Sequence, residues 1–128
     1  MRYGFTLVDN CLRAELIGRE TVAETRQFIL ATADEARRVQ CPRILVCVRR
    51  SRPIFMVEQY HVSDYFKELA KNPGVRVALT ADSAEVRAAH EYIEVLARQY
   101  GANVRAFREE APALEWLREG ALQSQEKR

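Results

Sequence analysis

The sequence predicts a single-domain α/β protein with a mixed, mostly parallel sheet of five strands and helices on its faces, in the order ββαβαβαβα. Three observations support this. A continuous apolar run at residues 44–48 is typical of a parallel strand buried on both faces. Strand-like segments alternate with amphipathic segments of helical length, which favours βαβ units with right-handed crossovers. A length of 128 residues with 48% hydrophobic residues fits one domain with a sizeable core.

The chain opens with a predicted β-hairpin. Residues 3–8 and 11–17 read as strands, and apolar residues alternate along the second of them. The Asp9-Asn10 pair between the two runs is typical of a tight turn. We therefore expect this hairpin to supply the one antiparallel pair of the sheet.

A helix and the central strand follow the hairpin. Thr21-x-x-Glu24 has the capping-box pattern, and apolar residues then recur at helical spacing. This helix should end near Val39, because Pro42 disfavours helical backbone before it. Residues 43–48 form the next predicted strand.

Residues 53–62 are aromatic and apolar without a clear period, so either a short helix or an extended cover fits them. Ser63 starts a helix that Pro73 ends. Residues 75–81 then form another buried strand.

Asp82 or Ser83 is expected to cap the next helix, and Gly101 is suited to its C-terminal end. Residues 103–107 make the last predicted strand. The prediction for the final helix is that Pro112 opens it and Gly120 ends it.

The predicted boundaries give one domain over residues 1–120 and a polar tail over residues 121–128.

Composition excludes several classes of protein. The net charge of +2 gives no electrostatic case for nucleic-acid binding. No apolar segment approaches the roughly 20 residues needed to cross a bilayer, and the N-terminus lacks the apolar core of a signal peptide. Cys11, Cys41 and Cys47 form no CxxC pair, so we expect reduced thiols in a cytoplasmic protein.

Known catalytic and cofactor motifs are missing, which favours a protein that is not an enzyme and has no cofactor. The chain has no GxxxxGK, GxGxxG or GxSxG pattern and too few histidines for a histidine-rich metal site. His90 and Glu94 are spaced for an acid–base pair, but ordinary contacts on a polar helix face explain that spacing better.

The candidate binding site lies where the central strand ends. Arg49, Arg50, Ser51 and Arg52 follow it directly, and ligand sites of open α/β sheets lie beyond the carboxyl ends of the strands. Guanidinium groups suit an anion or an acidic partner, while a solvated turn with paired arginines is the simpler alternative. Two residues after the next strand should share this edge of the sheet: Asp82 and Ser83.

An apolar cover or pocket is the second candidate site. The segment after Pro53 is more apolar than a surface loop needs, so it is expected to line a pocket, form a dimer contact or cover the core. The candidate pocket residues are Phe55, Val57, Tyr60, Tyr65 and Phe66.

Several local patterns resemble a known group. They are the opening hairpin, the strand RILVCV, the strand RVALTAD before a helix, and the ending NVRAFREEAPALEWL. Over residues 3–118 the chain is similar to the STAS-domain fold, and within it to SpoIIAA-like proteins. Where STAS regulators carry a phosphorylated serine in an Asp-Ser-Ser-Gly type motif, this chain has Ser51 between two arginines, without the acid and the glycine.

The resemblance implies a regulatory or protein-interaction module whose partner surface is formed by the residues around Ser51 and the apolar segment after them. Dimers are common in this fold, so a homodimer is also expected. SpoIIAA-like proteins also resemble lipid-binding domains, so a small apolar ligand is the alternative. The partner is therefore expected to be a protein or a small anionic or apolar molecule.

Overall fold

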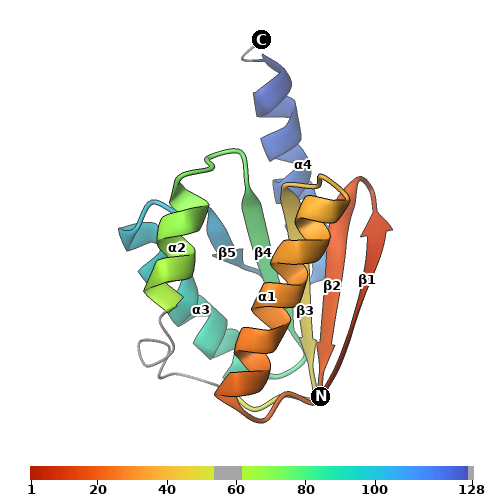
Figure 1. The fold of residues 1–128 in the computed structure, drawn as a ribbon, viewed down its shortest axis with the longest axis vertical. Helices are drawn as coiled ribbons and strands as arrows, with labels where there is room; N and C mark the ends of the chain where they lie inside the picture. Colours follow the sequence, from red (N-terminus) through yellow and green to blue (C-terminus); the bar gives the residue numbers. More distant parts are fainter. Residues whose placement is uncertain (54–61, 127–128) are drawn as a thin grey trace.

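The computed structural model has the predicted α/β fold, built around one five-stranded sheet (Figure 1). It describes residues 1–53 and 62–126. The elements follow the predicted order ββαβαβαβα. Their bounds are β1 Arg2–Val8, β2 Cys11–Ile17, α1 Val22–Arg38, β3 Arg43–Arg49, α2 Val62–Ala70, β4 Arg76–Ala81, α3 Ala84–Gln99, β5 Val104–Ala106 and α4 Glu110–Glu126.

The strands lie side by side in chain order, β1-β2-β3-β4-β5. The pair β1–β2 is antiparallel and the three other pairs are parallel. Asp9 and Asn10 form the hairpin turn with φ of 51° and 61°, a left-handed conformation that these residue types tolerate. The predicted hairpin is thus confirmed.

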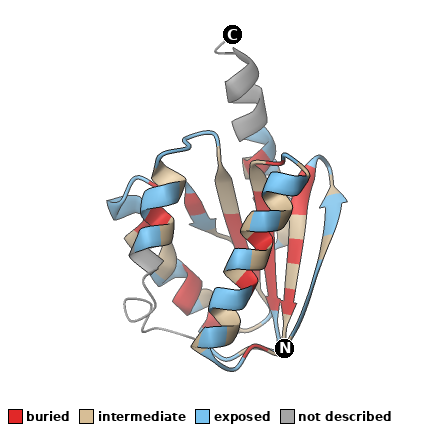
Figure 2. Cartoon of the chain, in the orientation of Figure 1, coloured by how far each residue is buried: buried red, intermediate tan, exposed pale blue. Residues whose placement is uncertain are grey.

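The helices divide unequally between the two faces of the sheet. Each new parallel strand adds on the same side, so right-handed crossovers place α1, α2 and α3 on one face. Their core residues include Phe28, Phe66 and Val86. Helix α4 returns across the other face (Figure 1). There Leu117 packs with Leu45 of β3, and buried residues lie along the strands between the two layers of helices (Figure 2).

The final helix is longer than predicted. It begins at Glu110, passes through Gly120 and continues to Glu126, within the segment predicted to be a tail. Pro112 is tolerated in the first turn, where the backbone N–H has no partner within the helix. A glycine inside a helix costs about 1 kcal/mol, and the helix-favouring residues after it extend the helix.

Strand β5 spans Val104–Ala106, within the predicted segment of residues 103–107. The two flanking residues each make one backbone hydrogen bond to β4: the carbonyl of Asn103 accepts the N–H of Val77 at 2.9 Å, and the N–H of Phe107 donates to the carbonyl of Leu79 at 2.8 Å. The predicted short helix or cover after Pro53 falls mainly outside the described residues. None of the described helices has the length and apolar character required to cross a membrane.

Candidate functional site

A recess of about 140 Å³ lies at the carboxyl ends of β3 and β4, beside the start of α4. From this edge of the sheet, β4 connects to α3 on one face and β5 connects to α4 on the other face. In open α/β sheets, ligands bind beyond the carboxyl ends of the strands, where such connections diverge. Its lining residues are Cys47, Val48, Arg49, Thr80, Ala81, Asp82, Arg108, Glu109 and Glu110.

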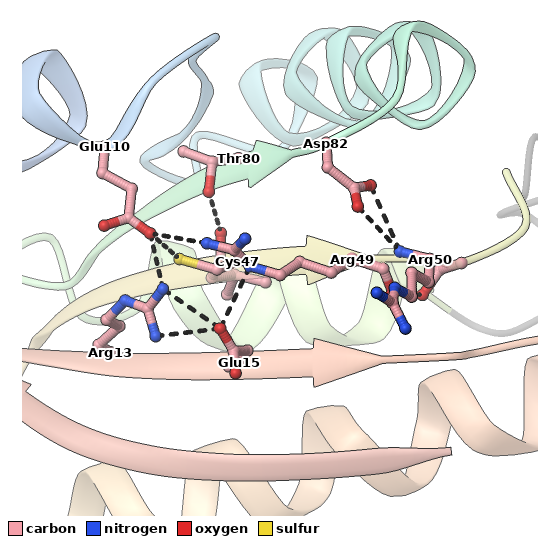
Figure 3. A network of polar contacts seen from close by, with 10 residues as sticks. Arg13, Glu15, Cys47, Arg49, Arg50, Thr80, Asp82 and Glu110 are labelled. Atoms are coloured by element: carbon pink, nitrogen blue, oxygen red, sulfur yellow. Dashed lines mark hydrogen bonds and ion pairs between the residues drawn. The ribbon is translucent and has the colours of Figure 1, made fainter.

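Two arginines and two glutamates form a charge network beneath α4 (Figure 3). The guanidinium of Arg13 lies 2.7 Å from Glu110 and 3.3 Å from Glu15. Nε of Arg49 lies 3.2 Å from Glu15, and its Nη2 is 3.8 Å from Glu110. The hydrogen bond from Arg13 is the main reason that the pKa of Glu110 is lowered.

The sequence of β2 explains why this network forms. Ala14 and Leu16 point toward α1 and are buried in the core. Because successive side chains of a strand point to opposite faces, Arg13 and Glu15 point to the face that α4 covers. Strand β2 pairs with β3, so they lie beside the side chains of that strand. Glu110 lies in the first turn of α4, where a carboxylate also interacts favourably with the helix dipole.

Cys47 lies within the network but is not an activated nucleophile. Its side chain is 2% exposed, and its thiol donates to Oε1 of Glu110 at 3.1 Å. Burial is the main cause that raises its pKa to about 11. The thiol is therefore protonated at neutral pH, whereas nucleophilic cysteines require a lowered pKa.

Residues 49–52, here called the arginine loop, are fixed by hydrogen bonds to neighbouring loops. Arg50 has a φ of +49°, and its backbone N–H donates to the carboxylate of Asp82 at 3.2 Å (Figure 3). The hydroxyl of Ser51 accepts the N–H of Arg19 at 3.0 Å and donates to the carbonyl of Arg49 at 2.9 Å. Ser51 thus joins the loops that follow β2 and β3.

Arg52 is tied to Arg19 at both of its backbone groups. Its N–H donates to the carbonyl of Arg19 at 2.9 Å, and its carbonyl accepts a hydrogen bond from the Arg19 guanidinium. The side chains of Arg50 and Arg52 are exposed, and no carboxylate of the described residues lies within ion-pair distance of them. Arg49 differs, because its side chain is held in the charge network.

Asp82 and Ser83 lie at the same edge of the sheet as the arginine loop. The N–H of Asp82 donates to the carbonyl of Val48 at 3.2 Å, which continues the β3–β4 pairing. Ser83 accepts the N–H of Val86 at 3.2 Å and is the N-cap of α3. Of the six predicted site residues, Arg50 and Arg52 thus direct their side chains to solvent, and the other four make intramolecular contacts.

His90 is not on a polar helix face, so the expected explanation for its spacing from Glu94 is wrong. It is 4% exposed, and among the described residues its Nδ1 has no hydrogen-bond partner. Burial, with the charge of Arg19, lowers its pKa to about 4. Glu94 instead accepts the N–H of Ala106 at 2.7 Å and pairs with Arg98 at 3.2 Å.

Of the five candidate residues of the apolar pocket, the structure describes two. Phe55, Val57 and Tyr60 lie outside the described residues. Phe66 is a buried core residue whose ring packs 6.2 Å from that of Tyr100, while Tyr65 is half-buried.

A second recess, of about 260 Å³, is not a purely apolar pocket, because its lining combines two alanines with three charged residues: Ala84, Ala88, Arg87, Glu91 and Arg108.

Sequence reasoning missed the partners of the predicted residues. Arg13 and Glu15 could have been noticed, because these two charged residues alternate with apolar residues along the second strand of the predicted hairpin. Glu110 and the buried Arg19 gave no signal that we can identify.

Comparison of the chain with protein-family models, with curated proteins and with solved structures finds no significant match. Within residues 1–53 and 62–126, no group of three or more His, Cys, Asp or Glu side chains is arranged to hold a metal ion.

Proposed function

We propose that the protein is a non-enzymatic regulatory or interaction module of STAS type, which binds an acidic segment of a partner protein at the arginine loop. The observation that carries this proposal is the contrast within the loop. Its backbone is fixed by Arg19 and Asp82, while the guanidinium groups of Arg50 and Arg52 are left exposed.

A fixed backbone favours binding because less conformational entropy is lost when the partner is bound. Guanidinium groups suit the carboxylates of Asp and Glu, since each can donate two parallel hydrogen bonds. The charges of Arg50 and Arg52 are also not neutralised by carboxylates of the described residues, unlike that of Arg49.

The residues of the recess favour binding over catalysis. Cys47 is protonated, and its thiol is already engaged by Glu110. Glu110 has a lowered pKa, and both it and Glu15 are paired with arginines. These groups stabilise the connection between the sheet and α4, and none is poised as a general base.

The test is the affinity of the purified protein for a fluorescein-labelled Glu-rich peptide, measured by fluorescence polarisation at low and high salt. The Arg50→Ala/Arg52→Ala variant should bind at least tenfold more weakly at low salt. The matched control is Arg37→Ala/Arg38→Ala, which removes the same formal charge from the last turn of α1. Its affinity should remain within about twofold of wild type, because these arginines pair with Asp34 and Glu35.

Equal losses in both double variants would indicate a response to net charge alone, and the proposal would then be abandoned. Unchanged binding in the Arg50→Ala/Arg52→Ala variant would have the same consequence. Thermal unfolding of each variant checks that the fold is intact.

A further inference from the structure

Strand β1 forms an open edge of the sheet, with no described element beyond it (Figure 1). It pairs with β2 over all seven residues without a bulge, from Arg2 opposite Ile17 to Val8 opposite Cys11. Edge strands of monomeric proteins are usually short, or are protected by proline, bulges or charges in mid-strand. Within β1 the sole charged side chain is Arg2, at one end.

The hairpin determines which backbone groups of β1 face outward. A two-residue turn makes the flanking pair, here Val8 and Cys11, exchange both of their hydrogen bonds. Such pairs alternate along an antiparallel ladder, so Thr6 and Gly4 also direct their backbone groups to β2. The N–H and C=O groups of Tyr3, Phe5 and Leu7 therefore point to the open edge.

We propose that this edge binds β1 of a second copy of the chain, antiparallel and centred on Phe5. Phe5 then faces Phe5 of the second copy, and Tyr3 faces Leu7 of the second copy on each side of the two-fold axis. All three residues carry the outward backbone groups, so the ladder gains about six hydrogen bonds. The two sheets become one continuous ten-stranded sheet with both α1 helices on the same face.

The side chains favour this register. Tyr3 and Leu7 are 39% and 61% exposed and lie on the α1 face, where Tyr3 also contacts Phe28. Pairing each Tyr3 with Leu7 of the other copy covers apolar surface that β1 leaves in water. Shifting the register by one residue would put the α1 helices of the two copies on opposite faces and separate these apolar side chains.

The charges are complementary across the same axis. Arg2 points to the α4 face, since it is paired with Ile17, and Asp9 lies on that face because it is 4.0 Å from Arg118. In the proposed pairing Arg2 faces Val8 of the second copy, which places Asp9 of that copy next to it. The two Arg2 residues are about 20 Å apart along the strands, so they do not repel one another strongly.

The first experiment measures the mass of the full chain by sedimentation velocity between about 1 and 200 µM. A shift from 14.8 kDa toward twice that mass is expected as concentration rises. Leu7→Pro removes an outward N–H and leaves the hydrogen bonds to β2 in place, so it should stay monomeric. Leu7→Val keeps the N–H and the apolar surface, and should associate like wild type.

The second experiment tests the register by disulfide formation under mild oxidation. Phe5→Cys places two thiols across the axis at a Cα separation of about 5.5 Å, which suits a disulfide. Tyr3→Cys is the matched control on the same strand and face, because the two introduced thiols would be about 14 Å apart. The native Cys11, Cys41 and Cys47 are buried and should not react.

A covalent dimer that forms at least tenfold faster with Phe5→Cys than with Tyr3→Cys supports the proposal. A monomer at every concentration overturns it, as does association of Leu7→Pro equal to that of Leu7→Val. Equal cross-linking of the two cysteine variants overturns the register. These measurements do not involve the arginine loop, so their outcome is independent of the function proposed above.

Discussion

The carboxylate of Asp82 accepts the backbone N–H of Arg50 at 3.2 Å and helps to hold this residue in a left-handed conformation, with φ of +49°. Arginine rarely adopts such a φ, because Cβ comes too close to the following carbonyl oxygen. The end of β4 thus supports the end of β3. The Arg50 side chain is exposed, whereas the side chain of Arg49 is held in the charge network.

Arg50→Gly should separate stability from binding. Glycine adopts positive φ without strain, so the free energy of unfolding should stay the same or rise by up to about 1 kcal/mol. Binding of the Glu-rich peptide should weaken, because one exposed guanidinium is lost. Arg52→Gly is the control, since Arg52 has no positive φ, and it should lower stability by about 0.5–1 kcal/mol. A larger loss in Arg50→Gly than in Arg52→Gly would contradict the role assigned to the conformation.

Glu110→Gln should destabilise the protein by about 1 kcal/mol at neutral pH, and by less at high salt. The glutamine side chain keeps its shape but replaces the carboxylate that Arg13 contacts at 2.7 Å with an uncharged amide. Because the pKa of Glu110 is lowered on folding, its contribution is present above pH 4.5 and lost as the pH falls below that value. Denaturant unfolding of both proteins at pH 7 and pH 3 measures this difference.

The control for that variant is Glu68→Gln. Glu68 pairs with Lys71 at 3.0 Å, but both side chains are largely exposed, so the change should be close to zero. Equal losses in the two variants would mean that the charge network beneath α4 adds nothing beyond an ordinary surface pair.

The fold was predictable because its signals are local. The Asp9-Asn10 turn, the Thr21 capping box and the apolar run of β3 each define an element within a few residues of chain, and the structure contains all three. Right-handed crossovers then leave few ways to arrange alternating strands and helices. The prediction that the last helix ends at Gly120 was wrong, because one glycine does not outweigh the helix-favouring residues around it.

The site was less predictable because its contacts are made between distant segments. That Arg49 meets Glu15 and Glu110 depends on the register of β2 with β3 and on which face α4 covers. The burial of His90 depends on how α3 is rotated against the sheet, and the helical spacing to Glu94 does not define that rotation. A sequence pattern places residues on an element, whereas tertiary packing decides which of them meet.

The three cysteines should react with a thiol reagent at least 100-fold more slowly in the native protein than in denaturant at pH 8. All are buried, and burial raises the pKa of Cys11 and, to about 11, that of Cys47. Cys11 and Cys47 therefore form few thiolates at pH 8 in the native protein, and burial limits access of the reagent to all three cysteines. Absorbance on labelling follows the rate, and one rapid equivalent before unfolding would show that a cysteine is accessible.

His90 should make stability depend on pH in the weakly acidic range. Its pKa is about 4 in the folded protein and about 6.5 when unfolded, so the unfolded chain binds more protons between these values. The contribution is complete above pH 6.5 and is lost as the pH falls toward 4, by up to about 3 kcal/mol. In His90→Gln this slope should be absent, while carboxylates still titrate below pH 5 in both proteins. Denaturant unfolding at intervals from pH 4 to 7 measures it, and parallel curves for the two proteins would show that His90 is not buried in its neutral form.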